Sequence, residues 1–198
     1  MRIGPWRQSN ITVWEDKNSG QGTDGKFGLD FFEKQIVEIN FEHRRLAVHD
    51  YLPAKVKTYD RLKLENRDGE LFAQGSCLIE GKTFTTKFLL HSGYAGGVLL
   101  DDVFAASAGV DGKITITEES ALQDSFGHTI KVKRGILPGF VLGSAKLANI
   151  PVGFFSGGAG AQKMSVIGGE VLKRFNLIFD IANNDLYLKP VRPLKDVS

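Results

Sequence analysis

The sequence predicts an all-β protein with minor short helices, arranged as a small closed β-fold. Short segments of alternating or apolar character are separated by glycine-containing turns, as in residues 71–90, where two strands flank a tight turn at residues 80–82. The chain also holds 14 Phe against 2 Met, which favours a stiff, β-rich core. Many short strands with frequent glycines are typical of closed β architectures.

The composition bounds the class of protein. With 198 residues, 42% hydrophobic and 24% charged, the chain has ordinary globular values that argue against disorder. The net charge is +2, and no basic tract is interleaved with aromatics, so we expect no nucleic-acid partner. The single Cys77 excludes an internal disulfide and a multi-Cys zinc site, and its apolar neighbours predict a core position. No apolar stretch reaches the roughly 18 residues of a membrane span.

Two segments match without a gap at an offset of 140 residues, the difference between Gly28 and Gly168. Residues 25–32 align with 165–172, and the match continues from 37–48 to 177–188. Both copies read as an apolar-Gly pair, a short helical turn, a strand, a polar turn and a second strand. Because the counterpart of residues 51–140 would precede Met1, we expect the chain to begin inside its first copy.

The repeat predicts four regions along the chain. We expect the C-terminal part of a first lobe at residues 1–50, a connector at 51–70, a complete lobe at 71–190 and a tail at 191–198. A short helix is expected near residues 170–175, with its counterpart in the first copy. The apolar side chains of the first copy should pack on the second copy or on another chain; they are Phe27, Phe31, Phe32, Val37, Ile39 and Phe41.

Three motifs follow one another across residues 70–190. A hairpin ends in Leu89-Leu90-His91-Ser92-Gly93, a helix is preceded by Val166-Ile167-Gly168, and a strand pair closes with Leu186-Tyr187-Leu188. In this order and separation they resemble the retropepsin-like aspartic proteases, including bacterial members, whose first motif is apolar-apolar-Asp-Thr/Ser-Gly. The resemblance implies a closed, acid-protease-like β-barrel lobe. We expect no cofactor and no metal, because no second ligand stands at metal spacing near His91.

The resemblance also assigns the site. His91 takes the position of the family's catalytic Asp, followed by Ser92 and Gly93. The positions implied for substrate binding are Tyr94, Ala95, Gly96, Ile167 and Gly168. The family's enzymes need two carboxylates that share one proton, and an imidazole cannot reproduce that pair. For His91, loss of catalysis, a ligand-binding role and other catalysis all stay open, whereas Ser92 and Gly93 have a structural role in a sharp turn.

Nearby carboxylates do not replace the missing aspartate. Asp101 and Asp102 stand at the start of a helical turn that Gly109 ends, so we predict that one of them caps it. Asp180 belongs to a strand beside a hairpin, and we interpret it as structural.

The resemblance implies a degenerate protease lobe that binds an extended peptide by strand addition, or that serves only as a structural lobe. The alternative is an active aspartic peptidase whose aspartates come from a missing upstream lobe or from a partner chain, as in a homodimer. Analogy with exported bacterial relatives points to the cell envelope or periplasm. Residues 1–10 have no apolar core of a signal peptide, so we expect either a cytoplasmic protein or a mature form of a longer one.

Overall fold

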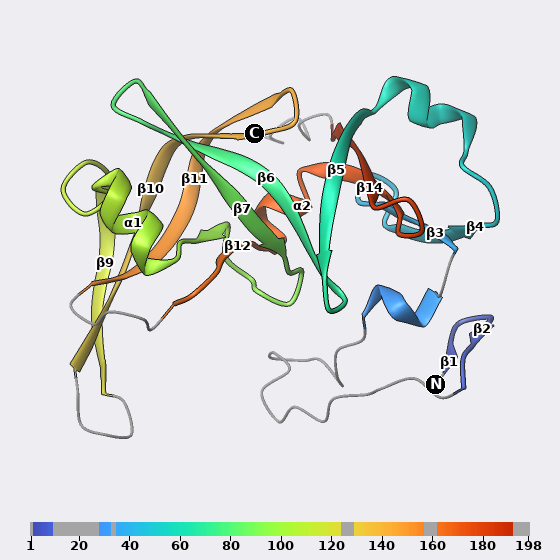
Figure 1. Ribbon diagram of the computed structural model, residues 1–198, viewed down its shortest axis with the longest axis horizontal. Coiled ribbons are helices and arrows are strands. Elements are labelled where there is room, and N and C mark those ends of the chain that lie inside the picture. The colour runs from blue at the N-terminus through green and yellow to red at the C-terminus, as the bar shows by residue number, and fades with distance from the viewer. Residues whose placement is uncertain (1, 10–27, 33–34, 124–128, 157–161, 192–198) are drawn as a thin grey trace, which may run out of the picture. The chain divides into compact units, whose positions relative to one another are not determined.

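The computed structural model describes residues 2–9, 28–32, 35–123, 129–156 and 162–191 (Figure 1). The chain divides into two compact units. Unit 1 comprises Met1–Lys63 and Phe175–Ser198, and unit 2 comprises Leu64–Arg174. These boundaries differ from the expected lobe at 71–190, because the last two strands pair with strands of residues 36–40 and 60–63.

Unit 1 contains an antiparallel sheet with the strand order β4-β3-β13-β14-β5. Its strands are β3 (Ile36–Asn40), β4 (Arg45–His49), β5 (Asp60–Arg67), β13 (Phe175–Asp180) and β14 (Asp185–Pro190). The unit also holds β1 (Arg2–Ile3), β2 (Trp6–Arg7), and the 3-10 helices η1 (Leu29–Phe32) and η2 (Ala54–Thr58). The expected connector, residues 51–70, therefore contains a helix and a strand. β5 pairs with β14 through residues 60–63 and with β6 through residues 64–67, so the division between the units falls inside this strand.

The internal repeat is confirmed by secondary structure. η1 spans residues 29–32 and the helix α2 (Gly169–Leu172) spans the same positions 140 residues later. The hairpin β3–β4 likewise has its counterpart in β13–β14, with Asn40 opposite Arg45 in one and Asp180 opposite Asp185 in the other. The two turns also match in conformation, since Arg44 has φ 50° and Asn184 has φ 51°. The helix and the hairpin register thus recur at the same constant offset of 140 residues.

The two hairpins pair with each other through β3 and β13. Ile39 lies opposite Leu177 and Val37 opposite Phe179, a register that relates the copies by a pseudo-twofold axis between Glu38 and Ile178. Phe31, Phe32 and Val37 are buried, and Val37 lies opposite Phe179 of the second copy. The ring of Phe32 contacts the rings of Trp6 and Phe31, within the first copy. Ile39 and Phe41 are half-buried. Phe27 lies outside the described residues.

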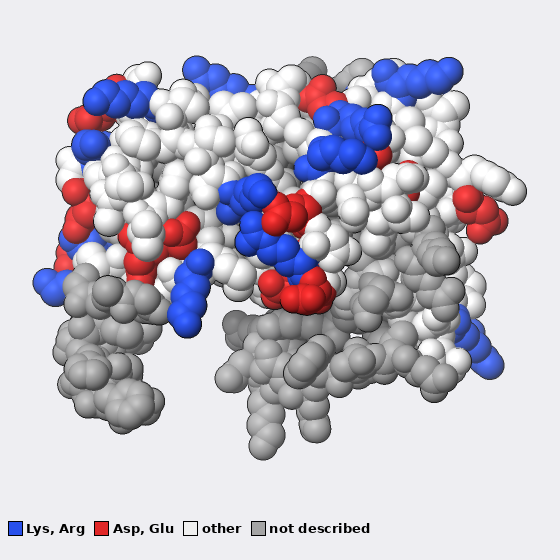
Figure 2. All heavy atoms as spheres, in the orientation of Figure 1, with Lys and Arg blue, Asp and Glu red and all other residues white. Residues whose placement is uncertain are grey.

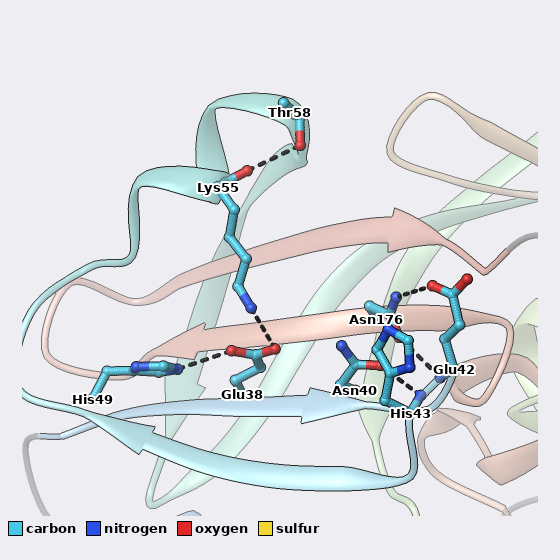
Figure 3. A network of polar contacts seen from close by, with 8 residues as sticks. All are labelled: Glu38, Asn40, Glu42, His43, His49, Lys55, Thr58 and Asn176. Atoms are coloured by element: carbon cyan, nitrogen blue, oxygen red, sulfur yellow. Dashed lines mark hydrogen bonds and ion pairs between the residues drawn. The ribbon is translucent and has the colours of Figure 1, made fainter.

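A buried carboxylate lies on the other face of this sheet. Glu38 on β3 is 0% exposed, and it accepts hydrogen bonds from Lys55 Nζ at 2.6 Å and from His49 Nε2 at 2.8 Å (Figure 3). Burial alone would raise the pKa of Glu38, but the hydrogen bonds from Lys55 and His49 outweigh it and lower the pKa. Since Lys55 belongs to η2, this carboxylate fastens the helix to the sheet.

Unit 2 is a closed ring of six strands. The strand order is β6-β7-β12-β8-β11-β10, and β10 pairs back onto β6 through residues 139–142 and 75–78. The strands of the unit are β6 (Glu70–Ile79), β7 (Lys82–Leu90), β8 (Val98–Leu99), β9 (Thr115–Gln123), β10 (Thr129–Leu142), β11 (Ala145–Ser156) and β12 (Ser165–Ile167). β9 extends the ring beside β10, and the helices are α1 (Asp102–Ala108) and α2. The all-β fold with minor short helices is therefore confirmed.

The interior of this ring is aromatic and aliphatic. Phe88 and Phe140 are both 0% exposed, and their rings meet edge to face with centroids 5.2 Å apart. Cys77 is also fully buried, and burial raises the pKa of its thiol to about 12. The prediction that Cys77 is a core residue is confirmed.

Candidate functional site

The candidate site is the loop of residues 91–97, which joins β7 to β8 in unit 2 (Figure 1). β7 pairs in parallel with β12, and Leu90 lies opposite Ile167. The loop therefore leaves the ring beside the end of β12, where residues 167–170 begin α2. The structure brings together the two segments that the sequence assigned to the site, although they lie more than seventy residues apart.

Main-chain hydrogen bonds tie these two segments together. The His91 amide donates to the Ile167 carbonyl at 3.0 Å, and the Gly168 amide donates to the Gly97 carbonyl at 2.8 Å. The Gly169 amide donates to the Tyr94 carbonyl at 2.7 Å. None of these bonds uses a side chain, so they would form whichever residue stood at position 91.

The side chains of the motif differ in their exposure. His91 is half-buried, whereas Ser92, Gly93 and Ala95 are exposed. The Gly93 amide donates to His91 Nδ1 at 3.1 Å. In this contact Nδ1 is the acceptor, so the main chain of the loop engages that ring nitrogen. Among the described residues, no carboxylate forms a hydrogen bond or ion pair with His91.

The aromatic ring of Tyr94 fills a recess made by glycines. Tyr94 packs against the buried cluster of Phe72, Leu89 and Val166. A Cβ atom added at Gly168 would lie 2.5 Å from Tyr94 Cδ1 and 2.6 Å from the Tyr94 carbonyl oxygen, so this position accepts only glycine without a shift of the loop. Burial raises the pKa of the Tyr94 hydroxyl, and Arg134 opposes that shift only in part. The hydroxyl is therefore protonated at neutral pH.

The two aspartates after β8 have structural roles. Asp101 is the N-cap of α1, and its Oδ1 accepts from the Phe104 amide at 2.8 Å, as predicted. Its Oδ2 accepts from Ser165 Oγ at 2.6 Å, which fastens the helix to the start of β12. Asp102 Oδ2 accepts from the Gln162 amide at 3.2 Å. Gly109 ends the helix with φ 62°, again as predicted. Both carboxylates are thus occupied by structural hydrogen bonds.

Asp180 has the structural role that the sequence predicts. Its Oδ2 accepts from Asn183 Nδ2 at 2.9 Å, and its Oδ1 accepts from the Asn183 amide at 3.3 Å, which closes the turn between β13 and β14.

A groove of about 450 Å³ lies beside the same strand β7. It is lined by Arg67, Phe72, Gln74, Thr85, Thr86, Lys87, Asp101, Lys163, Met164 and Ser165. Tyr94, Ala95, Gly96, Ile167 and Gly168 do not line it. No local sequence pattern indicates this groove, because its lining residues come from several strands and loops and become neighbours only in the folded ring.

Charges around the groove are partly compensated. Arg67 and Lys87 both pair with Glu65, and they lower the pKa of Glu65 to about 2. Figure 2 shows the same mixture over one face of the molecule, where Lys and Arg side chains lie against Asp and Glu side chains. Lys163 is different, since it is exposed and has no polar partner among the described residues. Among the described residues of the groove, Lys163 is therefore the cation available to a ligand.

Two further searches of the described residues gave negative results. In the part of the chain that the structure describes, no group of three or more His, Cys, Asp or Glu side chains could hold a metal ion. The same residues include no helix with the length and apolar character that crossing a membrane requires.

Comparison with known proteins leaves the family open. No family model matches the chain, and no curated protein matches it. Among solved structures, the chain is similar to the crystal structure of basic 7S globulin from soybean, with 11% sequence identity and a TM-score of 0.45. The match covers 78% of this chain and 50% of the globulin chain, so this chain spans about half the length of that protein.

Proposed function

We propose that unit 2 is an aspartic-protease-like lobe that has lost catalysis and binds an extended peptide segment. The observation that carries the proposal is the chemistry of His91. Aspartic peptidases use two carboxylates that share one proton, one as base towards water and the other as acid towards the carbonyl. The loop offers an imidazole at that position, and the described residues provide His91 with no carboxylate partner.

The surroundings of His91 support the same conclusion. Nδ1 accepts from the Gly93 amide at 3.1 Å, so the main chain engages that nitrogen. A histidine base is typically oriented by a carboxylate, and no carboxylate bonds to His91 among the described residues. Ser92 shows no hydrogen bond to any described residue, so a Ser-His pair is not formed.

The groove beside β7 supports a binding role. A volume of about 450 Å³ falls in the range of ligand sites. Phe72 and the partly exposed Met164 provide apolar walls, and Lys163 provides a cation with no polar partner among the described residues. The fitting ligand is therefore an extended peptide that presents an apolar side chain next to a carboxylate.

Binding is tested by fluorescence anisotropy with labelled extended peptides that differ only in having acidic or basic side chains. The acidic series should bind more tightly, and Lys163→Glu should remove that preference. Lys146→Glu, an equal charge change at an exposed lysine of β11 in the same unit, should leave it intact. Equal affinity of the native protein for both series would refute the proposed binding site and leave a structural role for unit 2.

Catalysis is tested with a quenched peptide library between pH 3 and pH 7. We expect no cleavage by the native protein, by His91→Ala or by monomeric His91→Asp, since one loop supplies at most one carboxylate. Cleavage by the native protein that survives His91→Ala would place catalytic residues elsewhere in the chain. Cleavage that is lost in His91→Ala would make His91 itself catalytic. Either result refutes the loss of catalysis without affecting the binding test.

A further inference from the structure

The outer edge of β4 in unit 1 differs from the equivalent edge of its repeat. β14, the counterpart of β4, pairs on its outer side with β5, where Asp185 lies opposite Lys63 and Leu186 opposite Leu62. β4 ends the sheet, and none of the described residues pairs with its outer side. The pseudo-twofold axis relates the outer edge of β14 to the outer edge of β4. β5 fills the first edge, whereas the second is open within the described structure.

Side-chain burial shows the same asymmetry. On β14, Leu186 and Leu188 are 0% exposed. Their counterparts 140 residues earlier, Leu46 and Val48, are only half-buried. The chain directly after β4 also exposes Tyr51 to 87%. An apolar row with open backbone hydrogen-bonding groups along one edge is a template for an added strand.

The charges at the edge indicate which strand fits. At the filled edge, Asp185 is 2% exposed and is held by Arg61 at 2.6 Å and Lys63 at 3.0 Å, both from β5. Its counterpart on β4 is Arg45, which is exposed and has no polar partner among the described residues. The charge at this position is therefore negative on β14 and positive on β4. A strand added at the β4 edge would accordingly carry carboxylates at the two positions where β5 has Arg61 and Lys63.

We propose that the outer edge of β4 binds an acidic, extended segment of another polypeptide as an added antiparallel strand. Its apolar side chains pack on Leu46 and Val48, and its carboxylates lie on both sides of the Arg45 guanidinium. A second copy of β4 is a poorer occupant, because β4 contains no acidic residue and so offers no carboxylate to the Arg45 guanidinium. This site belongs to unit 1 and is separate from the groove of unit 2.

The test uses two capped, labelled peptides based on residues 59–65 of β5. One has the native order Tyr-Asp-Arg-Leu-Lys-Leu-Glu, and the other replaces Arg61 and Lys63 by Glu. The acidic peptide should bind about fivefold or more tightly than the native one, as expected for cross-strand ion pairs in place of repulsion. Hydrogen exchange should slow at amides of β4 when the acidic peptide is added and stay unchanged in β10.

Three variants distinguish this site from general charge effects. Arg45→Glu should reverse the preference between the two peptides. Lys57→Glu, an equal change at an exposed lysine of η2, should preserve it, as should Lys163→Glu in the unit 2 groove. Equal binding of both peptides, or equal loss in Arg45→Glu and Lys57→Glu, would refute the proposal. So would protection, without peptide, of the outward-facing β4 amides that do not bond to β3, or a dimer in sedimentation whose formation blocks the peptide.

Discussion

The buried carboxylate of Glu38 makes a quantitative prediction for Lys55→Met. Breaking a buried ion pair by removal of one partner costs about 3–5 kcal/mol. Here His49 still donates to Glu38, and the Lys55 side chain is 38% exposed, so solvent already weakens the pair. We therefore expect a loss of about 2 kcal/mol in the free energy of unfolding of unit 1 at pH 7. Lys57→Met, in the same 3-10 helix but without a polar partner among the described residues, should change it by less than about 0.5 kcal/mol.

The pH dependence follows from the direction of the pKa shift. The folded state lowers the pKa of Glu38 from its ordinary value of 4.5, so its ion pairs contribute fully above that pH and are lost as pH falls through the lower folded value. The difference between native protein and Lys55→Met should therefore be largest near pH 7 and shrink below about pH 4, where burial favours a protonated carboxyl in the variant.

Intrinsic fluorescence during urea unfolding measures this effect, since Trp6 belongs to unit 1. Trp6 meets the ring of Phe32 edge to face at 5.9 Å, which makes its emission sensitive to unfolding. A Lys55→Met protein as stable as Lys57→Met at pH 7 would refute the reasoning. A loss of stability that is the same at pH 7 and well below pH 4 would show that lost packing, and not charge, is the cause.

Three further predictions concern local structure. Gly168→Ala should lower stability by about 1–3 kcal/mol in thermal unfolding, and by more than Gly153→Ala, whose added Cβ meets only atoms at 3.3 Å and beyond. Cys77 should not react with a thiol reagent at pH 8 until the protein is denatured, because burial raises its pKa to about 12; rapid labelling of the native protein would contradict its core position. Asn40→Ala and Asp180→Ala each remove the side-chain acceptor of a β-turn and should cost about 1 kcal/mol; a large effect at one position alone would argue against equivalent roles in the repeat.

The repeat could be predicted because it is written in local patterns. The apolar-Gly pair, the strand and the polar turn each have a period or a turn residue that a single sequence displays. The same is true of α1, where Asp101 and Gly109 stand at the two ends of a short apolar segment and cap it as expected. In both cases the residues that fix the element lie within a few positions of each other.

Features that depend on distant partners could not be predicted. Residues 51–70 were expected to form a connector because of their charges and Pro53, yet they contain η2 and β5. The alternation of Leu62 and Leu64 indicates a strand. That strand pairs with β14 through its first half and with β6 through its second half, and β14 lies far away in the sequence. The bond from Ser165 to Asp101 joins residues 64 positions apart, and no local pattern encodes it.

The contacts that hold the loop of residues 91–97 in place do not depend on the chemistry of the side chain at position 91. Residues 91–97 are fixed by main-chain bonds to residues 167–169 and by the fit of the Tyr94 ring against Gly168, none of which needs a carboxylate at position 91. These contacts therefore fix the shape of the loop whether or not position 91 can act as an acid or a base. The loop is an argument about the fold, and activity has to be measured at His91 itself.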